Sequence, residues 1–210
     1  MTWPPDTATY SDVMASPQEH RLDPTQLPKE FQVALSQITA ARLRPEVTID
    51  EMPAPQRIAP YATAMSAEVV VGDDEVASGR LVVLHDPRGN DAWGGDFRCV
   101  AYVRAEVEPS MASDDMLAAV GWSWLVEALA SEGAQYIAPS GTVTCVYSAS
   151  FGALAKEDPD AQIEIRASWT PTDSLTAHVQ AWTNVMCEAA GLPPVPEGVA
   201  VLPRSGNRKR

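Results

Sequence analysis

The sequence predicts an α+β protein with a single antiparallel sheet of about five strands and helices packed on one face, in the order α-β-β-β-α-β-β-α. Two segments repeat apolar residues at helical spacing, and a third is apolar almost all round. Between them, apolar and polar residues alternate along short stretches separated by turn residues. Because short turns join consecutive strands, the strands should pair antiparallel, since parallel pairing needs long crossovers.

The first predicted helix covers residues 28–43, and Pro45 ends it. Pro28 fits the first helical position, where a missing N–H costs nothing. The apolar residues that follow at spacings of four and three are Phe31, Leu35 and Ile38.

Three strands are expected next. An extended, proline-rich segment over residues 53–60 enters a strand over 61–71, in which apolar residues share one parity. A short apolar strand over 81–85 is expected to close in a turn over 86–90. The third strand follows Gly94-Gly95 and alternates strictly from Phe97 to Val107, so one of its faces should belong to the core.

The second predicted helix begins near Ser113, Asp114 and Asp115, which suit an N-terminus, and runs to Glu132 before Gly133. Glu127 is its only charge between Asp115 and Glu132. A helix of this kind must be covered on two sides, either by the third helix or by a second subunit. Its apolar residues include Met116, Leu117, Val120, Trp122, Trp124, Leu125, Val126 and Leu129.

The last two strands and the third helix complete the pattern. Alternation from Val143 to Tyr147 and from Ile163 to Trp169 predicts two strands joined by a turn over 157–160. Thr172 or Asp173 should cap a final helix that Gly191 and Pro193 end. Its apolar positions are Leu175, Val179, Trp182, Met186 and Ala189.

The chain of 210 residues should hold one domain over residues 28–192. Residues 1–27 are rich in proline and lack any periodicity, which predicts a disordered N-terminal lead. Residues 193–210 predict a flexible, proline-rich and basic tail, whose positive charges are Arg204, Arg208, Lys209 and Arg210.

Composition limits the classes of function. The formal net charge of -13 should repel phosphate backbones and anionic bilayers, which argues against nucleic-acid and membrane partners. No apolar run approaches the roughly 18 residues that span a bilayer, and residues 1–10 show no signal-peptide pattern, so a cytoplasmic protein is expected. The three cysteines lie far apart, without a CxxC pair, and are expected to be reduced.

No catalytic, cofactor-binding or metal-binding set stands out. His85-Asp86 could share a metal or a proton, but the chain has only three histidines, and Asp86 before Pro87 also suits a turn. Cys99 and Cys145 follow the apolar parity of their strands, and Cys187 lies late in a helix, where the dipole disfavours a thiolate. We therefore expect no catalytic residue, cofactor or metal.

Two candidate surfaces remain. The polar parity of the strands should project Arg98, Tyr102, Arg104, Glu106, Glu164 and Arg166 together, either as cross-strand charge pairs or as a site for a polar ligand or peptide. The helix that carries Trp122 and Trp124 offers either core packing or an interface with a second subunit.

Five blocks of sequence are distinctive: MPAPQRIAPYA (52–62), GRLVVLHDPRG (79–89), FRCVAYVRAEVEP (97–109), VGWSWL (120–125) and EIRASWTP (164–171). They resemble the actinobacterial domain-of-unknown-function family 3000, to which no activity, cofactor or site is assigned. The resemblance implies only a gene neighbourhood with a ribonuclease D-like exonuclease. Separately, the order of elements resembles the small acidic chaperones of type III secretion systems, which dimerise and bind extended client peptides.

These observations predict a non-enzymatic binding or adaptor protein, chaperone-like, that acts through protein–protein contacts and forms a homodimer through a helix face. The alternative is a small-molecule-binding protein or enzyme, with a pocket near His85 and Asp86 and the sheet face of Arg98, Arg104 and Glu106. The basic tail is either a solvated terminus or a weak, salt-dependent contact for RNA.

Overall fold

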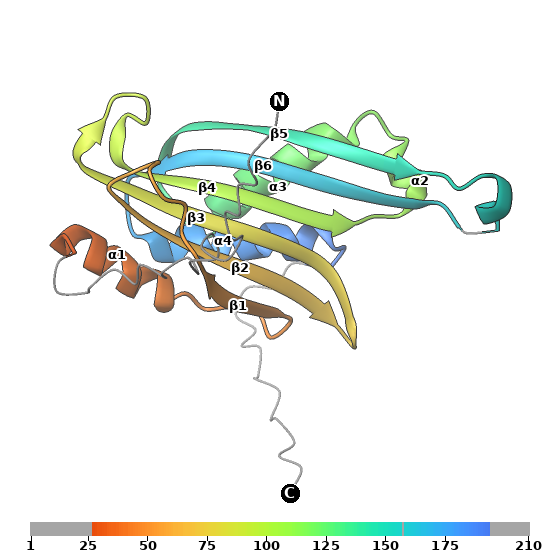
Figure 1. Cartoon of the computed structure of the whole chain (residues 1–210), viewed down its shortest axis with the longest axis horizontal. Helices are drawn as coiled ribbons and strands as arrows, with labels where there is room; N and C mark the ends of the chain where they lie inside the picture. Colours follow the sequence, from red (N-terminus) through yellow and green to blue (C-terminus); the bar gives the residue numbers. More distant parts are fainter. Residues whose placement is uncertain (1–26, 157, 194–210) are drawn as a thin grey trace, which may run out of the picture.

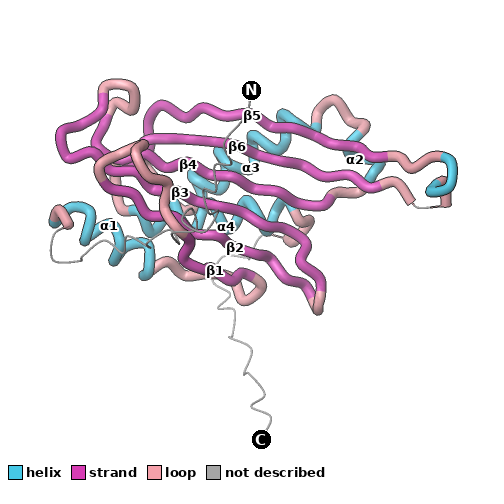
Figure 2. The backbone as a smooth tube through the Cα atoms, in the orientation of Figure 1, coloured by secondary structure: helices cyan, strands magenta, loops and turns pink. Residues whose placement is uncertain are grey.

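The structure is a computed structural model, and it describes residues 27–156 and 158–193. Its strands form one antiparallel sheet in the spatial order β1-β2-β3-β4-β6-β5. Figure 1 shows the sheet as one curved layer, and Figure 2 shows the same layer as continuous strand segments with the helices behind it. The strands are β1 (Val47–Met52), β2 (Tyr61–Val71), β3 (Asp74–Asn90), β4 (Gly95–Glu106), β5 (Tyr136–Ser148) and β6 (Asp160–Pro171).

The helices lie on one face of this sheet, as the sequence predicts. Helix α4 contacts β2, β3, β4 and β6, while α3 contacts β5, β6 and α4. Helix α1 contacts α4. The opposite face, here called the open face, carries no helix among the described residues. The helices are α1 (Lys29–Thr39), α2 (Pro109–Ala112), α3 (Leu117–Ser131) and α4 (Leu175–Ala189), and a short 3-10 turn, η2, covers Gly152–Leu154.

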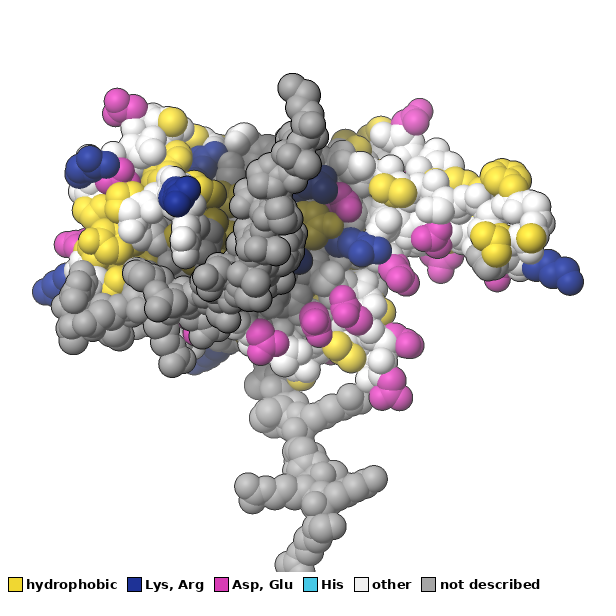
Figure 3. Space-filling view, viewed as in Figure 1, with side chains coloured by type: hydrophobic (Ala, Val, Ile, Leu, Met, Phe, Trp, Pro, Cys, Tyr) yellow, Lys and Arg dark blue, Asp and Glu magenta, His cyan; other side chains and the backbone are white. Residues whose placement is uncertain are grey.

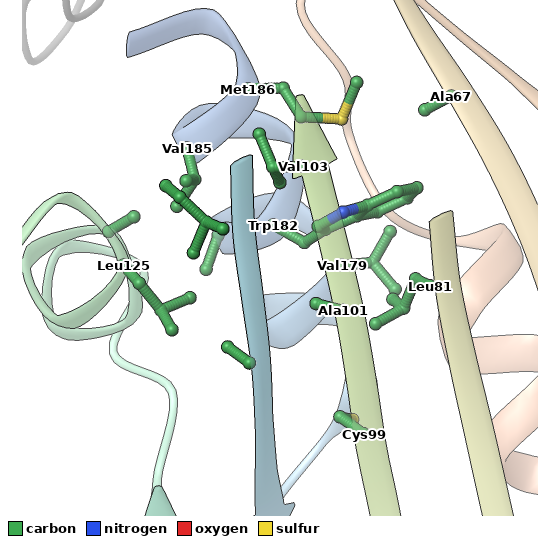
Figure 4. Packing of buried hydrophobic residues seen from close by; sticks show 14 of the residues in the cluster. Ala67, Leu81, Cys99, Ala101, Val103, Leu125, Val179, Trp182, Val185 and Met186 are labelled. Carbon is green, nitrogen blue, oxygen red and sulfur yellow. The ribbon is translucent and has the colours of Figure 1, made fainter. Parts of the chain in front are cut away.

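The core lies between the sheet and α4. Trp169 and Trp182 are fully buried, and the indole N–H of Trp182 donates to the carbonyl oxygen of Tyr102 at 3.3 Å. Figure 4 shows Trp182 beside Val179 and Met186 of the same helix, above apolar side chains of β3 and β4. The alternating residues of β4 thus supply the floor of the core, as its strict sequence period predicts.

Close packing of α3 on the sheet depends on two glycines. A Cβ at Gly121 would lie 2.7 Å from Cδ1 of Ile163, so the helix approaches β6 closely there. A Cβ at Gly141 of β5 would lie 2.7 Å from the Trp122 ring and would also contact the backbone oxygen of Arg166. Trp122 therefore lies over β5, with its ring in the space that a side chain at Gly141 would fill.

The sheet has six strands rather than about five, because β1 was not expected. Its six residues lie between Pro45 and Pro53, and their alternation is interrupted by the acidic pair Asp50 and Glu51. Pairing with β2, from Val47 opposite Val69 to Met52 opposite Ala64, stabilises this short strand at the edge of the sheet. Such pairing depends on a neighbouring strand and leaves little signal in the strand's own sequence.

Several boundaries also differ from the sequence-based expectation: α1 ends at Thr39 rather than at residue 43, and β5 begins at Tyr136 rather than at Val143. Strand β3 continues through residues 86–90, where a turn was expected, and the turn lies after Asn90. Helix α3 begins at Leu117, after the short helix α2, although Asp114 does accept a hydrogen bond from the Met116 N–H at 2.8 Å. Helix α4 is capped by Ser174, because the carboxylate of Asp173 is bonded elsewhere.

Candidate binding surface

The open face brings together the polar residues that the sequence predicts to share one parity. On β4, Tyr102 lies between Arg80 of β3 and Arg166 of β6. In the next row, Arg104 lies between Ser78 and Glu164. Glu106 pairs with Gln162 of β6 at the end of β4, and Arg98 lies at the opposite end. Figure 3 shows basic side chains on this side of the molecule.

One cluster on the open face is internally paired. The Tyr102 hydroxyl donates to Oε1 of Glu164 at 3.1 Å, and the Arg166 guanidinium forms an ion pair with Oε2 of the same carboxylate. The Arg166 guanidinium also lies 5.3 Å from the centre of the Tyr102 ring. Burial, together with the hydrogen bond to Glu164, raises the pKa of Tyr102, so the phenol stays protonated at neutral pH. Glu164 therefore neutralises Arg166.

Arg98 is different, because the residue is only 9% exposed and the groups that its guanidinium bonds are all neutral. One nitrogen, Nη1, donates to the carbonyl oxygen of Ala138 at 3.0 Å and to Oγ1 of Thr170 at 3.1 Å. The other, Nη2, donates to the hydroxyls of Ser168 at 2.7 Å and Ser140 at 3.3 Å. Burial lowers the pKa of Arg98, but a guanidinium remains charged at any physiological pH. The strands thus hold a positive charge without a carboxylate beside it.

A bulge in β5 makes this arrangement possible. The register of β5 against β6 shifts between Ile137 and Ser140, and Ala138 has a positive φ of 49°. A bulge re-aims backbone groups, and here the carbonyl of Ala138 turns toward Arg98. The site is therefore shaped by the backbone as well as by side chains.

The open face is basic only across β3, β4 and β6, because Asp50 of β1 and Glu68 of β2 lie on the same face toward the β1 edge. Arg104 bonds the side-chain oxygen of Gln162 rather than a carboxylate, and Arg80 is exposed and forms no ion pair within the described residues. In the rows that β3, β4 and β6 share, four arginines face two glutamates, whereas the whole chain has 15 basic and 28 acidic residues. The arginines are Arg80, Arg98, Arg104 and Arg166, and the glutamates are Glu106 and Glu164.

His85 lies on the other side of the sheet, under α1. Its ring stacks between Phe97, at 4.1 Å between centroids, and Phe31, at 5.8 Å. Its Nδ1 lies 3.1 Å from the carbonyl oxygen of Asp96, which can only accept, so the proton sits on Nδ1. Its Nε2 is then a buried acceptor without a hydrogen-bond partner in the part of the chain that is described. His85 and the arginine face consequently do not line one common pocket.

Asp86 acts within its own hairpin. Its carboxylate accepts hydrogen bonds from the backbone N–H and the guanidinium of Arg88, at 3.1 and 3.2 Å. These bonds hold the pKa of Asp86 below its usual range. Asp86 thus lies within β3 rather than at the start of a turn, and its carboxylate is satisfied by Arg88.

A cleft of about 400 Å³ opens between α1 and the junction of β6 with α4. Phe97, which stacks on His85, forms part of its wall, and Asp173 lies at the same place. Behind Asp173, its Oδ1 accepts from Nε2 of His178 at 2.8 Å, and Nδ1 of His178 accepts from the Trp169 indole at 3.0 Å. The remaining lining residues are Lys29, Glu30, Val33, Ala34, Gln37, Pro171 and Leu175.

Sequence reasoning did not single out the hydrogen-bonded series of Trp169, His178 and Asp173, here called the relay. It did not single out Arg80 either. The relay joins a strand, a turn and a helix, and its members share no motif; only the spacing of Asp173 and His178, across the start of a helix, hints at it. Arg80 follows Gly79 in a stretch whose alternation becomes visible only once β3 is known to extend back to Asp74.

The remaining candidates have ordinary structural environments. Trp122 and Trp124 are half-buried on α3. Burial raises the pKa of the Cys99 thiol, and raises that of Cys187 to about 11. Within residues 27–156 and 158–193, no group of three or more metal-ligating side chains forms a site. The predicted N-terminal lead and the basic tail with Arg204, Arg208, Lys209 and Arg210 lie outside the described residues, apart from positions 27 and 193.

The fold and this surface define an α+β protein whose antiparallel sheet is covered by helices on one face and carries a basic, hydroxyl-rich patch on the other. Residues 27–200 match the model of a protein family described as a protein of unknown function, DUF3000, and the chain belongs to this family. No curated protein and no solved structure matches the chain. None of the helices in the described ranges is long and apolar enough to cross a membrane.

Proposed function

We propose that this protein is a non-catalytic binding module, an adaptor with a chaperone-like mode of action, that holds an extended acidic segment of a partner protein on its open face. The observation that carries the proposal is the set of arginines without carboxylate partners on that face, above all the buried guanidinium of Arg98. A chain with a net charge of -13 that keeps a basic surface has a place where an acidic partner is attracted rather than repelled.

An apolar row between the arginines of the same face favours a peptide over a free anion. In the row between Arg98 and Tyr102, Val100 is 40% exposed and lies between Val82 of β3 and Ser168 of β6. An extended peptide with acidic and apolar side chains two residues apart could contact both kinds of surface, because strand residues two apart point the same way. The three cysteines within the described residues are free, which fits a reducing compartment, and we place the protein in the cytoplasm.

The proposal is tested with a fluorescein-labelled peptide that repeats glutamate–threonine–valine–threonine, so that glutamate and valine point the same way, and with a matched peptide that has lysine in place of glutamate as the opposite-charge probe. Anisotropy should show binding of the glutamate peptide at physiological salt. Arg104→Glu should weaken that binding roughly tenfold or more, since a charge-assisted contact contributes about 1.5–3 kcal/mol. Arg42→Glu makes the same change in net charge at an exposed position between α1 and β1 and should have a much smaller effect.

Two results would overturn this function. Equal weakening by Arg42→Glu and Arg104→Glu would mean that only the overall charge attracts the peptide. Absence of binding by the glutamate peptide, or tighter binding of the lysine peptide, would mean that the open face is a solvated surface with local charge pairs.

A second candidate function rests on the cleft beside α1. Its wall combines apolar side chains, such as Val33 and Phe97, with the carboxylate of Asp173, whose orientation the relay through His178 fixes. Clefts with an apolar wall and a few oriented polar groups are typical small-molecule sites. The dye anilinonaphthalene sulfonate should bind there if the cleft accepts ligands, and Val33→Trp should abolish its binding. Val126→Trp, on the exposed surface of α3, is the matched control.

A further inference from the structure

We propose that two copies of this chain associate through the free edge of β5, so that their sheets join into one continuous sheet with the two α3 helices side by side. This association uses the edge of the sheet and the outer surface of α3. It leaves the open face uncovered, so it stands independently of the proposed peptide binding.

The two edges of the sheet differ in how they are protected against pairing. Edge strand β1 has six residues, and its charged pair, Asp50 and Glu51, disfavours addition of another strand. Edge strand β5 has thirteen residues and no charged side chain. Its bulge protects only its beginning, around Ala138 and Pro139. From Gly141 to Ser148 it pairs in regular register with β6, and no described strand pairs with its other side.

The backbone of this free edge is complementary to itself. In an antiparallel ladder, alternate residues direct their N–H and C=O groups toward opposite neighbours. The eight residues from Gly141 to Ser148 therefore present about four outward N–H groups and four outward C=O groups, which in a symmetric pair of copies supply up to about eight hydrogen bonds. Threonine and valine, which favour strands, occupy four of these eight positions.

Symmetry then determines where the helices lie. A two-fold axis that relates two antiparallel copies of one strand runs perpendicular to the sheet, so both copies keep their helices on the same side. Helix α3 lies over this edge, since Trp122 covers Gly141 and Gly121 approaches Val143. Pairing of the two β5 strands consequently brings the α3 helices of the two copies next to each other.

The surface of α3 fits such a neighbour. Among its fifteen residues only Glu127 is charged. Val120 and Val126 are 37% and 36% exposed, and Met116, just before the helix, is 62% exposed. Helix α3 is covered by its own sheet and by α4, and its remaining outer surface, with Val120 and Val126, is apolar and exposed.

Charge identifies the occupant as a second copy. Each chain carries a net charge of -13, so two copies repel wherever their acidic surfaces meet. Strand β5 and helix α3 have 28 residues together, of which only Glu127 is charged, so identical chains can approach along their exposed sides without bringing many like charges together. A self-complementary edge and a neutral helix on the same side of the molecule are what a symmetric dimer requires.

Sedimentation velocity of the full chain, from about 1 to about 100 µM, tests this inference, because dimer formation depends on concentration by mass action. The wild-type chain should sediment as a dimer in the upper part of that range. Thr144→Lys, which places a charge on the free edge, should raise the dissociation constant at least roughly tenfold. Thr48→Lys places the same charge on the other edge strand, β1, and should leave the dissociation constant unchanged.

Hydrogen exchange of the wild-type chain keeps the inference testable even if Thr144→Lys fails to fold. Amides within 141–148 should exchange more slowly at high than at low protein concentration, while amides of β1 should not change. A chain that stays monomeric throughout the range would overturn the inference, and so would a dimer that protects no amide within 141–148. Loss of peptide binding with the dimer intact would count against the proposed function alone.

Discussion

The indole N–H of Trp169 donates a hydrogen bond of 3.0 Å to Nδ1 of His178. Since an indole can only donate, Nδ1 must be the unprotonated nitrogen, and the proton on Nε2 is donated to Asp173 at 2.8 Å. Both ring nitrogens of this fully buried histidine are therefore satisfied only in the neutral form. Burial lowers the pKa of His178 from its ordinary value, although the carboxylate of Asp173 acts in the opposite direction.

This relay predicts a pH-dependent stability. With the pKa of His178 lowered in the folded protein, the unfolded chain takes up the proton first as the pH falls through about 6.5. The free energy of unfolding should then decrease, by at most about 1.36 kcal/mol per pH unit for one group, until the folded pKa is passed. In His178→Gln the amide can accept from Trp169 and donate to Asp173 but cannot titrate, so this part of the slope should disappear.

Urea unfolding between pH 7.5 and 5.5, followed by circular dichroism, measures the effect on both chains. Other groups contribute equally to both slopes, so the difference between the two chains isolates His178. Identical slopes in wild type and variant would show that His178 does not carry the effect.

Two glycines at the contact between α3 and the sheet, Gly121 and Gly141, predict different losses of stability when each is replaced by alanine. In Gly141→Ala the new methyl group would meet the backbone oxygen of Arg166 and the Trp122 ring, and a strand backbone cannot easily move away. We expect a loss of roughly 1–3 kcal/mol or more. In Gly121→Ala the closest atoms are the ends of the Ile163 and Val143 side chains, and the gain in helix propensity, about 1 kcal/mol, offsets part of the cost.

Midpoints of urea unfolding for both alanine variants check this order. A smaller loss for Gly141→Ala than for Gly121→Ala would mean that Trp122 does not rest on β5 as described. The same measurement with Gly133→Ala, at a position with a φ of +71° and open space around it, separates backbone strain from overpacking.

Sequence reasoning predicts most strongly those elements whose pattern is local. Strand β4 alternates between buried and more exposed residues from Cys99 to Glu106, and α3 ends at Ser131, next to the expected Glu132. Strand β1 was not predicted, because it is stabilised mainly by its pairing with β2. The environment of Arg98 could not be predicted either, since Ser140, Ser168 and Thr170 lie 42, 70 and 72 residues away in the chain.

The sequence predicted which polar side chains share one face of the sheet, but not which of them bond to each other. Parity alone places Arg104 and Glu164 on one side of the sheet, and the register sets them directly opposite each other. The side chains nevertheless pair differently. Glu164 forms an ion pair with Arg166 and accepts a hydrogen bond from Tyr102, while Arg104 donates to Gln162. Competition among neighbouring side chains decides such partners, and a single sequence carries no trace of it.

The burial of the cysteine thiols predicts which of them react with an alkylating reagent. Cys99 and Cys187 are fully buried, and burial raises the pKa of both. Treatment of the folded protein with iodoacetamide at about pH 8 should leave these two unmodified, while half-buried Cys145 reacts slowly. Mass spectrometry of peptides from native and urea-treated samples reports each site. Rapid labelling of Cys99 in the folded protein would contradict its position inside the sheet.

Replacing His85 by leucine should change the free energy of unfolding only slightly. The His85→Leu change removes one hydrogen bond, from Nδ1 to Asp96, which contributes about 0.5–1.5 kcal/mol. It also removes Nε2, whose burial without a partner costs a comparable 1–3 kcal/mol, roughly. The two effects oppose each other, and leucine fills a similar volume between Phe31 and Phe97. The free energy of unfolding should therefore change by less than about 1 kcal/mol.

Phe31→Ala provides the contrast within the same cluster, because it leaves a cavity against His85 and should cost about 3–5 kcal/mol. Thermal and urea unfolding of both variants measure the two effects side by side. If His85→Leu proved as damaging as Phe31→Ala, Nε2 would have to be bonded in the folded protein. The imidazole would then hold the α1 side of the sheet together through a contact that the described residues do not supply.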